Sequence, residues 1–501
     1  MLNKPIDFIK TVFIYILTVL MLVSAGYYIN ARQNSGKIYD IPLEKRRIFE
    51  GNIVFTEIDE THFNPVQITL TFGGESKTTV YDDVLTDGIY EYDFIKSAVS
   101  GLFNNSADCV VYDHSEGSEL WQKAAGMENS VYIRYAGDYI YPVIYTFLDS
   151  RNYDNINRDK PLAEVMELFI VDLDPIFGVS RDSEGNVAAF IPSGDNRGRE
   201  YISREINSFL QMVFNNIERE VPGKILSSDI NNLYLPDSFY FLGDNPVIYS
   251  PVLIFENPLL DSSGNMDLNQ NFIKNLFRLL NFNYERAHYS SSITSAVYTD
   301  GFNSVIFNEN GQINYRHRAV DIGTSGLHLS RFLGYDSDYY NFFDKLKAAS
   351  AFANILLKDF VDLTGGFESR LLLKDIFYEN NDLNVVFAYY HRGIEIRIRH
   401  GALVLKINKT GISEVTINAL KVSRHSIIKN IDPMLILREI DRLISEDIIG
   451  FELTEEFIGG LEEKYNLQYN KNKGKFFVSQ FELIYNVDYF GGICEPVWVI
   501  G

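Results

Sequence analysis

The chain contains little cysteine and no excess of basic residues. Of its 501 residues only two are Cys, and 45 Lys and Arg stand against 67 Asp and Glu, which gives a formal net charge of −22. Cys109 and Cys494 lie far apart and form no CxxC pair, which excludes a disulfide scaffold, a zinc ribbon and a cysteine-ligated cluster. Because an acidic surface repels phosphate backbones, no nucleic-acid partner is expected.

Motifs of common enzyme classes are missing as well. The eight histidines form no HExxH pattern, so no metal ligand is predicted. Neither GxGxxG nor GxxxxGK[ST] occurs, so no cofactor-binding residue is predicted either. With no catalytic residue to nominate, we expect a protein that is not an enzyme.

One serine lies in a turn-like segment close to a histidine and an aspartate. The segment Gly323-Thr-Ser325-Gly326 is one residue short of the GxSxG nucleophile elbow, and it follows Asp321 and precedes His328. Proximity in sequence does not place three side chains together in space. We therefore interpret the segment as a turn.

A second segment alternates oxygen-bearing side chains in the way calcium loops do. Asp261, Ser263, Asn265 and Asp267 follow this pattern, but Phe272 occupies the position where a calcium loop places its bidentate acid. A solvated loop is the favoured interpretation.

The rest of the composition is that of a folded protein. Hydrophobic residues make up 46% of the chain and aromatics 14%, well above what a disordered chain carries. The length allows three or four folded units and a large core.

A single long apolar segment lies near the amino terminus. Thr11–Ile29 carries no charge and, as an α-helix, reaches roughly the 30 Å thickness of the bilayer core. A cleaved signal peptide is the alternative, with Lys4 and Lys10 as its basic region and a small-residue cut near Ala25. We favour an anchor because the apolar stretch continues beyond that cut to Ile29, so 1–30 is predicted as a cytosolic tail and transmembrane helix.

The expected location is the cell membrane, with a single pass and the body outside the cytoplasm. A bare count of basic residues opposes this orientation, because two precede the helix and five follow it by position 47. Long domains are translocated largely regardless of charge, however, and a short amino-terminal tail usually stays in the cytosol. Residues 31–50 are predicted to form a stalk between the bilayer and the body.

Small or hydroxyl-bearing residues recur every seven positions in the apolar segment. Thr11, Thr18 and Ala25 would lie on one side of the helix, where they allow another helix to approach closely and the two hydroxyls to form hydrogen bonds across the contact. We predict a partner-helix contact at these three residues. Exposure of the same side to lipid is the alternative.

The body is predicted to be α+β, with three lobes of mixed antiparallel sheets and helices. Domains are expected at 51–225, 226–360 and 361–501, since Pro222-Gly223 ends a helix before the first boundary. A hairpin is expected over 304–315, turning at Asn310-Gly311. Helices are expected over 92–102, 119–125, 200–220, 270–280, 341–360 and 433–444. Strands are expected over 52–58, 67–72, 131–135, 247–255, 375–378, 383–390, 393–399, 402–407, 476–485 and 496–500, with a continuous apolar run over 139–147.

Four segments of the carboxyl-terminal half resemble one known family. They are Gly393-Ile-Glu-Ile-Arg397, Ile444-Ser-Glu-Asp-Ile448, Phe481-Glu-Leu-Ile-Tyr485 and Pro496-Val-Trp-Val499. Together with one amino-terminal membrane helix and a multi-lobed body, they resemble the YycH/YycI-type accessory regulators of the cell-envelope two-component system of Gram-positive bacteria. Over residues 225–501 the likeness is in the sequence pattern. Over residues 1–30 it is in the position of the membrane helix.

The resemblance implies a regulatory role without chemistry. Such a protein modulates a membrane-bound sensor histidine kinase by protein–protein contact, which allows a hetero-oligomer, and its helix binds the lipid bilayer. Two alternatives stay open from the sequence: an exported ligand-binding or wall-polymer-binding module, and, less favoured, an extracellular hydrolase.

Overall fold

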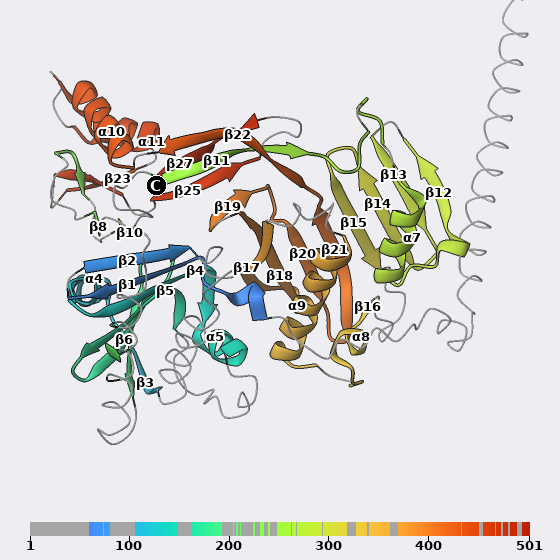
Figure 1. The fold of residues 1–501 in the computed structure, drawn as a ribbon, viewed down its shortest axis with the longest axis horizontal. Helices are drawn as coiled ribbons and strands as arrows, with labels where there is room; N and C mark the ends of the chain where they lie inside the picture. Colours follow the sequence, from blue (N-terminus) through green and yellow to red (C-terminus); the bar gives the residue numbers. More distant parts are fainter. Residues whose placement is uncertain are drawn as a thin grey trace, which may run out of the picture.

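The fold is mixed α+β, as the sequence predicts, and most of its strand pairs are antiparallel. The computed structural model describes residues 60–73, 75–80, 106–148, 163–192, 204, 207–208, 211, 224–225, 231–234, 239–240, 248–261, 263–266, 268–292, 294–317, 327–337, 340–360, 369–391, 393–431, 433–449, 454–465, 467–471, 474–478, 481–487 and 493–500. Figure 1 shows two large sheets, with a long ribbon crossing above them.

Seven strands form the first sheet, in the order β2-β1-β4-β5-β6-β7-β3. Alternate residues of β4, an interior strand, face two different cores: Val131 and Ile133 enter the large core, whereas Tyr132 packs with Trp121 on the other face. That second face is covered by α4 (His114–Ala125), whose amino terminus is capped by the Asp113 carboxylate. The strands are β1 (Gln67–Phe72), β2 (Glu75–Val80), β3 (Ser106–Val111), β4 (Ser130–Ile140), β5 (Glu164–Leu173), β6 (Ile176–Arg181) and β7 (Val187–Pro192).

The apolar run over 139–147 divides between two elements. Its first two residues end β4, and the helix α5 (Tyr141–Leu148) follows at once. Pro142 favours this change because its fixed φ suits the first turn of a helix and its missing N–H is not needed there.

The second large sheet has twelve strands and takes them from both sides of position 360. Its main path runs β12-β13-β14-β15-β21-β20-β18-β19-β25-β27, while β16 pairs with β21 and β17 with β18. The strands are β12 (His288–Ser291), β13 (Ser295–Thr299), β14 (Asn303–Asn308), β15 (Gln312–His317), β16 (Leu327–His328), β17 (Ser369–Glu379), β18 (Asp382–His391), β19 (Ile394–Arg397), β20 (Leu403–Ile407), β21 (Gly411–Asn418), β25 (Phe481–Asn486) and β27 (Pro496–Ile500).

Helices α7 (Gln270–Leu279), α8 (Ser330–Leu333) and α9 (Phe342–Asp359) accompany the second sheet. The predicted helices over 270–280 and 341–360 are confirmed, with Asn269 and Asn341 as their side-chain caps. Asn341 and Asp344 form a reciprocal capping box, which satisfies two amide donors at the start of α9. The predicted hairpin is confirmed too, with Gly311 at φ +83° in its turn.

A long ribbon joins the second sheet to a smaller group of helices and strands (Figure 1). In the ribbon, β11 (Ile248–Glu256) pairs with β22 (Lys421–Ile431) and with β26 (Ile493–Cys494). The smaller group has its own core around Leu437, Leu461 and Phe476. It contains α10 (Pro433–Ile448), α11 (Glu455–Tyr465), β9 (Leu233–Tyr234), β23 (Gln468–Asn470) and β24 (Lys475–Phe477), and a further pair joins β8 (Lys224–Ile225) to β10 (Phe239–Tyr240).

One predicted strand is wrong as a single element. The segment 476–485 divides into the end of β24, which belongs to the small sheet, and β25 of the large sheet. Phe476 and Val478 are buried in the small core, whereas Tyr485 is buried in the large one. An apolar pattern reports burial but not which core a residue enters, so the sequence could not separate these two strands.

Several expectations fall outside the described residues. They include the strand over 52–58, the helix over 92–102, the stalk, and the membrane helix with Thr11, Thr18 and Ala25. In the part of the chain that the structure describes, no helix is both long and apolar enough to span a bilayer. The three lobes and their boundaries stay predictions.

Candidate functional site: a charged junction between the two sheets

The two large sheets meet where β4 leaves its regular pairing with β5. The register of this pair shifts between Arg134 and Tyr139, and the intervening segment lies against β17. Ala136 belongs to a small buried cluster with Leu372 and Ala388 of the second sheet. Small side chains on both partners allow the backbones to approach closely.

Side-chain hydrogen bonds between described residues cross the junction to backbone carbonyls. The Tyr390 hydroxyl donates to the Ala136 carbonyl at 3.4 Å, and the Tyr139 hydroxyl donates to the Leu373 carbonyl. His62 Nδ1, in the short helix η2 (Glu60–Phe63), lies 2.5 Å from the Leu371 carbonyl oxygen. A carbonyl can only accept, so Nδ1 carries the proton. These bonds satisfy buried polar groups on both sheets and so fix their relative position.

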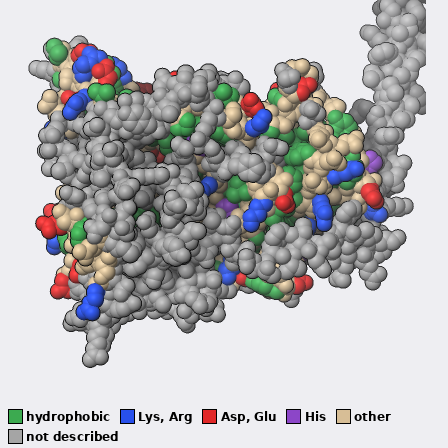
Figure 2. Space-filling model, viewed as in Figure 1, with side chains coloured by type: hydrophobic (Ala, Val, Ile, Leu, Met, Phe, Trp, Pro, Cys, Tyr) green, Lys and Arg blue, Asp and Glu red, His purple; other side chains and the backbone are tan. Residues whose placement is uncertain are grey.

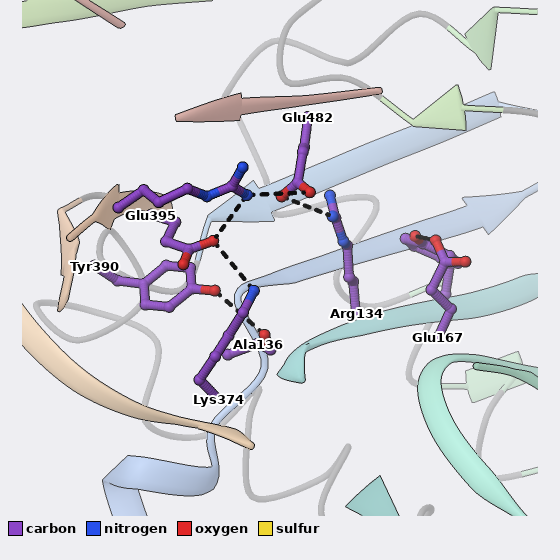
Figure 3. A network of polar contacts seen from close by, with 9 residues as sticks. Arg134, Ala136, Glu167, Lys374, Tyr390, Glu395 and Glu482 are labelled. Carbon is purple, nitrogen blue, oxygen red and sulfur yellow. Dashed lines mark hydrogen bonds and ion pairs between the residues drawn. The ribbon is translucent and has the colours of Figure 1, made fainter. Parts of the chain in front are cut away.

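A chain of ion pairs runs beside these hydrogen bonds (Figure 3). Glu482 of β25 lies between two guanidinium groups, 3.9 Å from Arg134 of the first sheet and 3.4 Å from Arg397 of the second. Arg397 also reaches Glu395 at 3.4 Å, and Lys374 of β17 reaches the same Glu395 oxygen at 3.1 Å. The exposed fractions of Glu395 and Glu482 are 8% and 11%, so both carboxylates are largely shielded from water.

The first sheet continues the network beyond Arg134, which is opposite Glu167 in the β4–β5 pair. Glu167 accepts from Arg181 Nε at 2.8 Å and from the Tyr132 hydroxyl, and the Arg181 guanidinium lies 4.4 Å from the centroid of the Trp121 ring. Burial by itself would raise the pKa of Glu167, but Arg181, Arg134 and the Tyr132 hydroxyl outweigh burial and lower it. Burial, followed by the charge of Glu167, raises the pKa of Tyr132 well above its usual value. Glu167 is therefore held as a carboxylate and Tyr132 as a neutral donor.

This arrangement pairs partly buried carboxylates with cations and so fixes their positions. Each carboxylate faces at least one cation, and Glu482 links the guanidinium of one sheet to that of the other. Removing one member would leave its partner partly buried without compensation, which is the costly case for a shielded ion pair. We refer to Arg134, Lys374, Glu395, Arg397 and Glu482 as the junction network.

Sequence reasoning did not find the junction network. The only local signal is a charged residue inside an otherwise apolar strand, as at Arg134 in Val-Tyr-Ile-Arg-Tyr-Ala and Glu482 in Phe-Glu-Leu-Ile-Tyr. That signal marks a partner somewhere in the fold but does not identify it.

The residues considered for chemistry from the sequence have mixed outcomes. Asp321 and Ser325 lie outside the described residues. His328 does contact a serine and an acid, but these are Ser330 and Asp336. Ser330 is therefore the serine that the described residues place beside His328.

The calcium-like segment forms hydrogen bonds between its own residues. Asp261 Oδ1 accepts from the amides of Ser263 and Asn265, both at 2.8 Å, and Gly264 has φ +79°. These bonds form an Asx turn and agree with the solvated-loop interpretation. Among the described residues, no three His, Cys, Asp or Glu side chains are grouped closely enough to hold a metal ion.

Comparison with known proteins identifies no relative. No family model, no curated protein and no solved structure matches the chain.

Proposed function

We propose that the chain is a membrane-anchored regulatory protein whose body lies outside the cytoplasm and acts through protein–protein contacts. The observation that carries the proposal is the junction between the sheets. A continuous apolar core spans both sheets, and Glu482 bridges Arg134 of one to Arg397 of the other. We infer that sheets joined in this way move together and that a contact made on one affects the other.

The partner that we propose is a membrane-bound sensor histidine kinase, and this part rests on the family resemblance. Three of the four segments that carry the resemblance are neighbours in the fold. β19 pairs with β25 in parallel, and β25 pairs with β27 in the antiparallel sense. Arg397 and Glu482 of the junction network lie in two of these strands.

A second candidate function is an exported module that binds ligands or wall polymers. Tyr289 of β12 is 58% exposed, and its ring packs against that of Tyr298 in a tilted arrangement at a centroid distance of 4.9 Å. Exposed aromatic faces suit the apolar faces of sugar rings. Under this alternative, titrating the protein with soluble wall-polysaccharide fragments gives binding that Tyr289→Ala abolishes.

The regulatory role is tested in membrane vesicles from source cells that contain or lack the chain. After addition of ATP, phosphohistidine on membrane proteins of sensor-kinase size is measured over time. The proposal expects a different rate of phosphohistidine formation when the chain is missing, with the original rate restored by the wild-type chain. Equal rates in both kinds of vesicle would contradict it.

A further inference from the structure

A serine, a histidine and an aspartate meet where β16 leads into α8. Ser330 Oγ lies 2.7 Å from His328 Nδ1, and His328 Nε2 lies 3.6 Å from Asp336 Oδ1. The first distance is that of a hydrogen bond, whereas the second is longer than a hydrogen bond and forms an ion pair only when the imidazole is protonated. The three side chains therefore stand in the order serine, histidine and aspartate.

The hydrogen bonds determine which ring nitrogen carries the proton. The backbone amide of Ser330 also points to His328 Nδ1, at 3.3 Å. An amide N–H can only donate, so Nδ1 must present its lone pair to Ser330. In the neutral ring the proton is then on Nε2, which faces Asp336. A general base needs this state: a lone pair toward the hydroxyl and an N–H toward the acid.

The surrounding residues hold the group in place. His328 pairs with Gly411 in the second sheet, and its ring lies edge-on to the fully buried Tyr340 at 6.0 Å. The Tyr340 hydroxyl donates to the Tyr335 carbonyl and accepts from the Ser337 amide, each at 3.1 Å, which fixes the loop that carries Asp336. The Tyr340 oxygen is a second acceptor within reach of Ser330, so the one proton of the Ser330 hydroxyl goes either to His328 Nδ1 or to Tyr340.

Solvent reaches His328 and Asp336, although the buried Tyr340 packs against the other side of the group. The exposed fraction of the His328 side chain is 35%, and that of Asp336 is 82%. Ser330 itself is half-buried.

We propose that Ser330 is a base-activated nucleophile toward carboxylic esters, with His328 as its base and Asp336 as a positioning residue. The proposal adds an activity and does not rest on the regulatory role. Ser330 Oγ bonds to the acyl carbon while its proton passes to His328 Nδ1. The bond from the acyl carbon to the alcohol oxygen then breaks, and the leaving alcohol takes that proton. Water releases the acyl group by the same steps, giving a carboxylic acid and restoring Ser330.

The nucleophile is tested with a biotinylated fluorophosphonate on the full chain in mild detergent. Ser330 Oγ would bond to phosphorus as fluoride leaves. We expect peptide mass spectrometry to find the label on Ser330. Ser330→Ala should abolish labelling, whereas the nearby control Ser337→Ala should keep it. Wild-type protein without label on Ser330 would overturn the proposal.

The base and the acid are tested by the rate of labelling and by hydrolysis of p-nitrophenyl acetate. His328→Gln is expected to lower both rates by about 100-fold or more, the usual contribution of a general base. Asp336→Asn should lower them by about tenfold or more, and Asp336→Glu should restore part of the loss. Because Asp336 is exposed, these two variants leave the fold intact, which thermal melting checks. Unchanged rates in both His328→Gln and Asp336→Asn would overturn the assignment.

Discussion

The backbone of Gly137 in β4 lies directly against the carbonyl of Lys374 in β17. A Cβ atom at position 137 would stand 2.7 Å from the Lys374 carbonyl carbon and 3.2 Å from its Cα, and closer still to the carbonyl oxygen. These atoms are backbone on both sides, so neither can turn away. Glycine is required here because two sheets approach each other, and the requirement is visible only in the fold.

Gly137→Ala is therefore expected to destabilise the protein. The added methyl group forces the sheets apart at the junction, at a cost of about 1 to 3 kcal/mol, which is usual for overpacking. The measurement is thermal unfolding of the full chain in detergent. Gly459→Ala in α11 is the matched control, since its Cβ would meet nothing within 4 Å, and the change should raise the melting temperature slightly. Equal melting temperatures for Gly137→Ala and wild type would contradict the close approach.

Glu482→Gln tests the ionic part of the junction. The substitution keeps the size of the side chain but removes the charge that faces Arg134 and Arg397. The Glu482 carboxylate is largely buried whereas both guanidinium groups are partly exposed, so we expect a loss of roughly 1 to 3 kcal/mol in unfolding free energy, between that of a surface pair and that of a buried pair. Glu414→Gln, which breaks an exposed pair with Arg316, should change stability little. Similar losses in both variants would argue against a special role for Glu482.

Glu167 is expected to make the protein less stable at acid pH. Its folded pKa is lower than its unfolded pKa, which is about 4.3, because Arg181, Arg134 and Tyr132 outweigh burial. The stabilisation is therefore fully present above that unfolded value and is lost as the pH falls through the lower folded value. Melting temperatures from pH 7 down to 3 should fall less steeply for Glu167→Gln than for wild type. Parallel curves would show that Glu167 contributes nothing to the acid sensitivity.

Much of the local structure could be predicted from the sequence. The helices over 270–280 and 341–360 are predicted from apolar residues at helical spacing, and in the structure Asn269 and Asn341 cap amides only two or three positions away. Asn310-Gly311 predicts its hairpin in the same way, since a turn needs only its own residues. In these cases the residues that specify a helix or a turn lie within a few positions of it in the sequence.

The junction could not be predicted in the same way. Arg134 and Glu482 come from distant parts of the chain, and no local pattern pairs them. Ser330 and Asp336 were missed for a related reason, because their relation to His328 depends on the turn that α8 makes after β16. The sequence predicts where polar groups stand along the chain, whereas the fold decides which of them meet.

The central claim is that the chain contacts a membrane-bound partner, and recovery of that partner from detergent-solubilised membranes tests it most directly. The tagged full chain is compared with Thr18→Leu/Ala25→Leu, which adds bulk on the predicted contact side while favouring insertion. Ile16→Leu/Val23→Leu is the control, because these positions lie on the opposite side of an ideal α-helix. We predict that wild type and control recover a sensor histidine kinase and that the Thr18→Leu/Ala25→Leu variant recovers much less. Equal recovery by all three would contradict the helix contact, and recovery of no membrane partner by wild type would contradict the regulatory role itself.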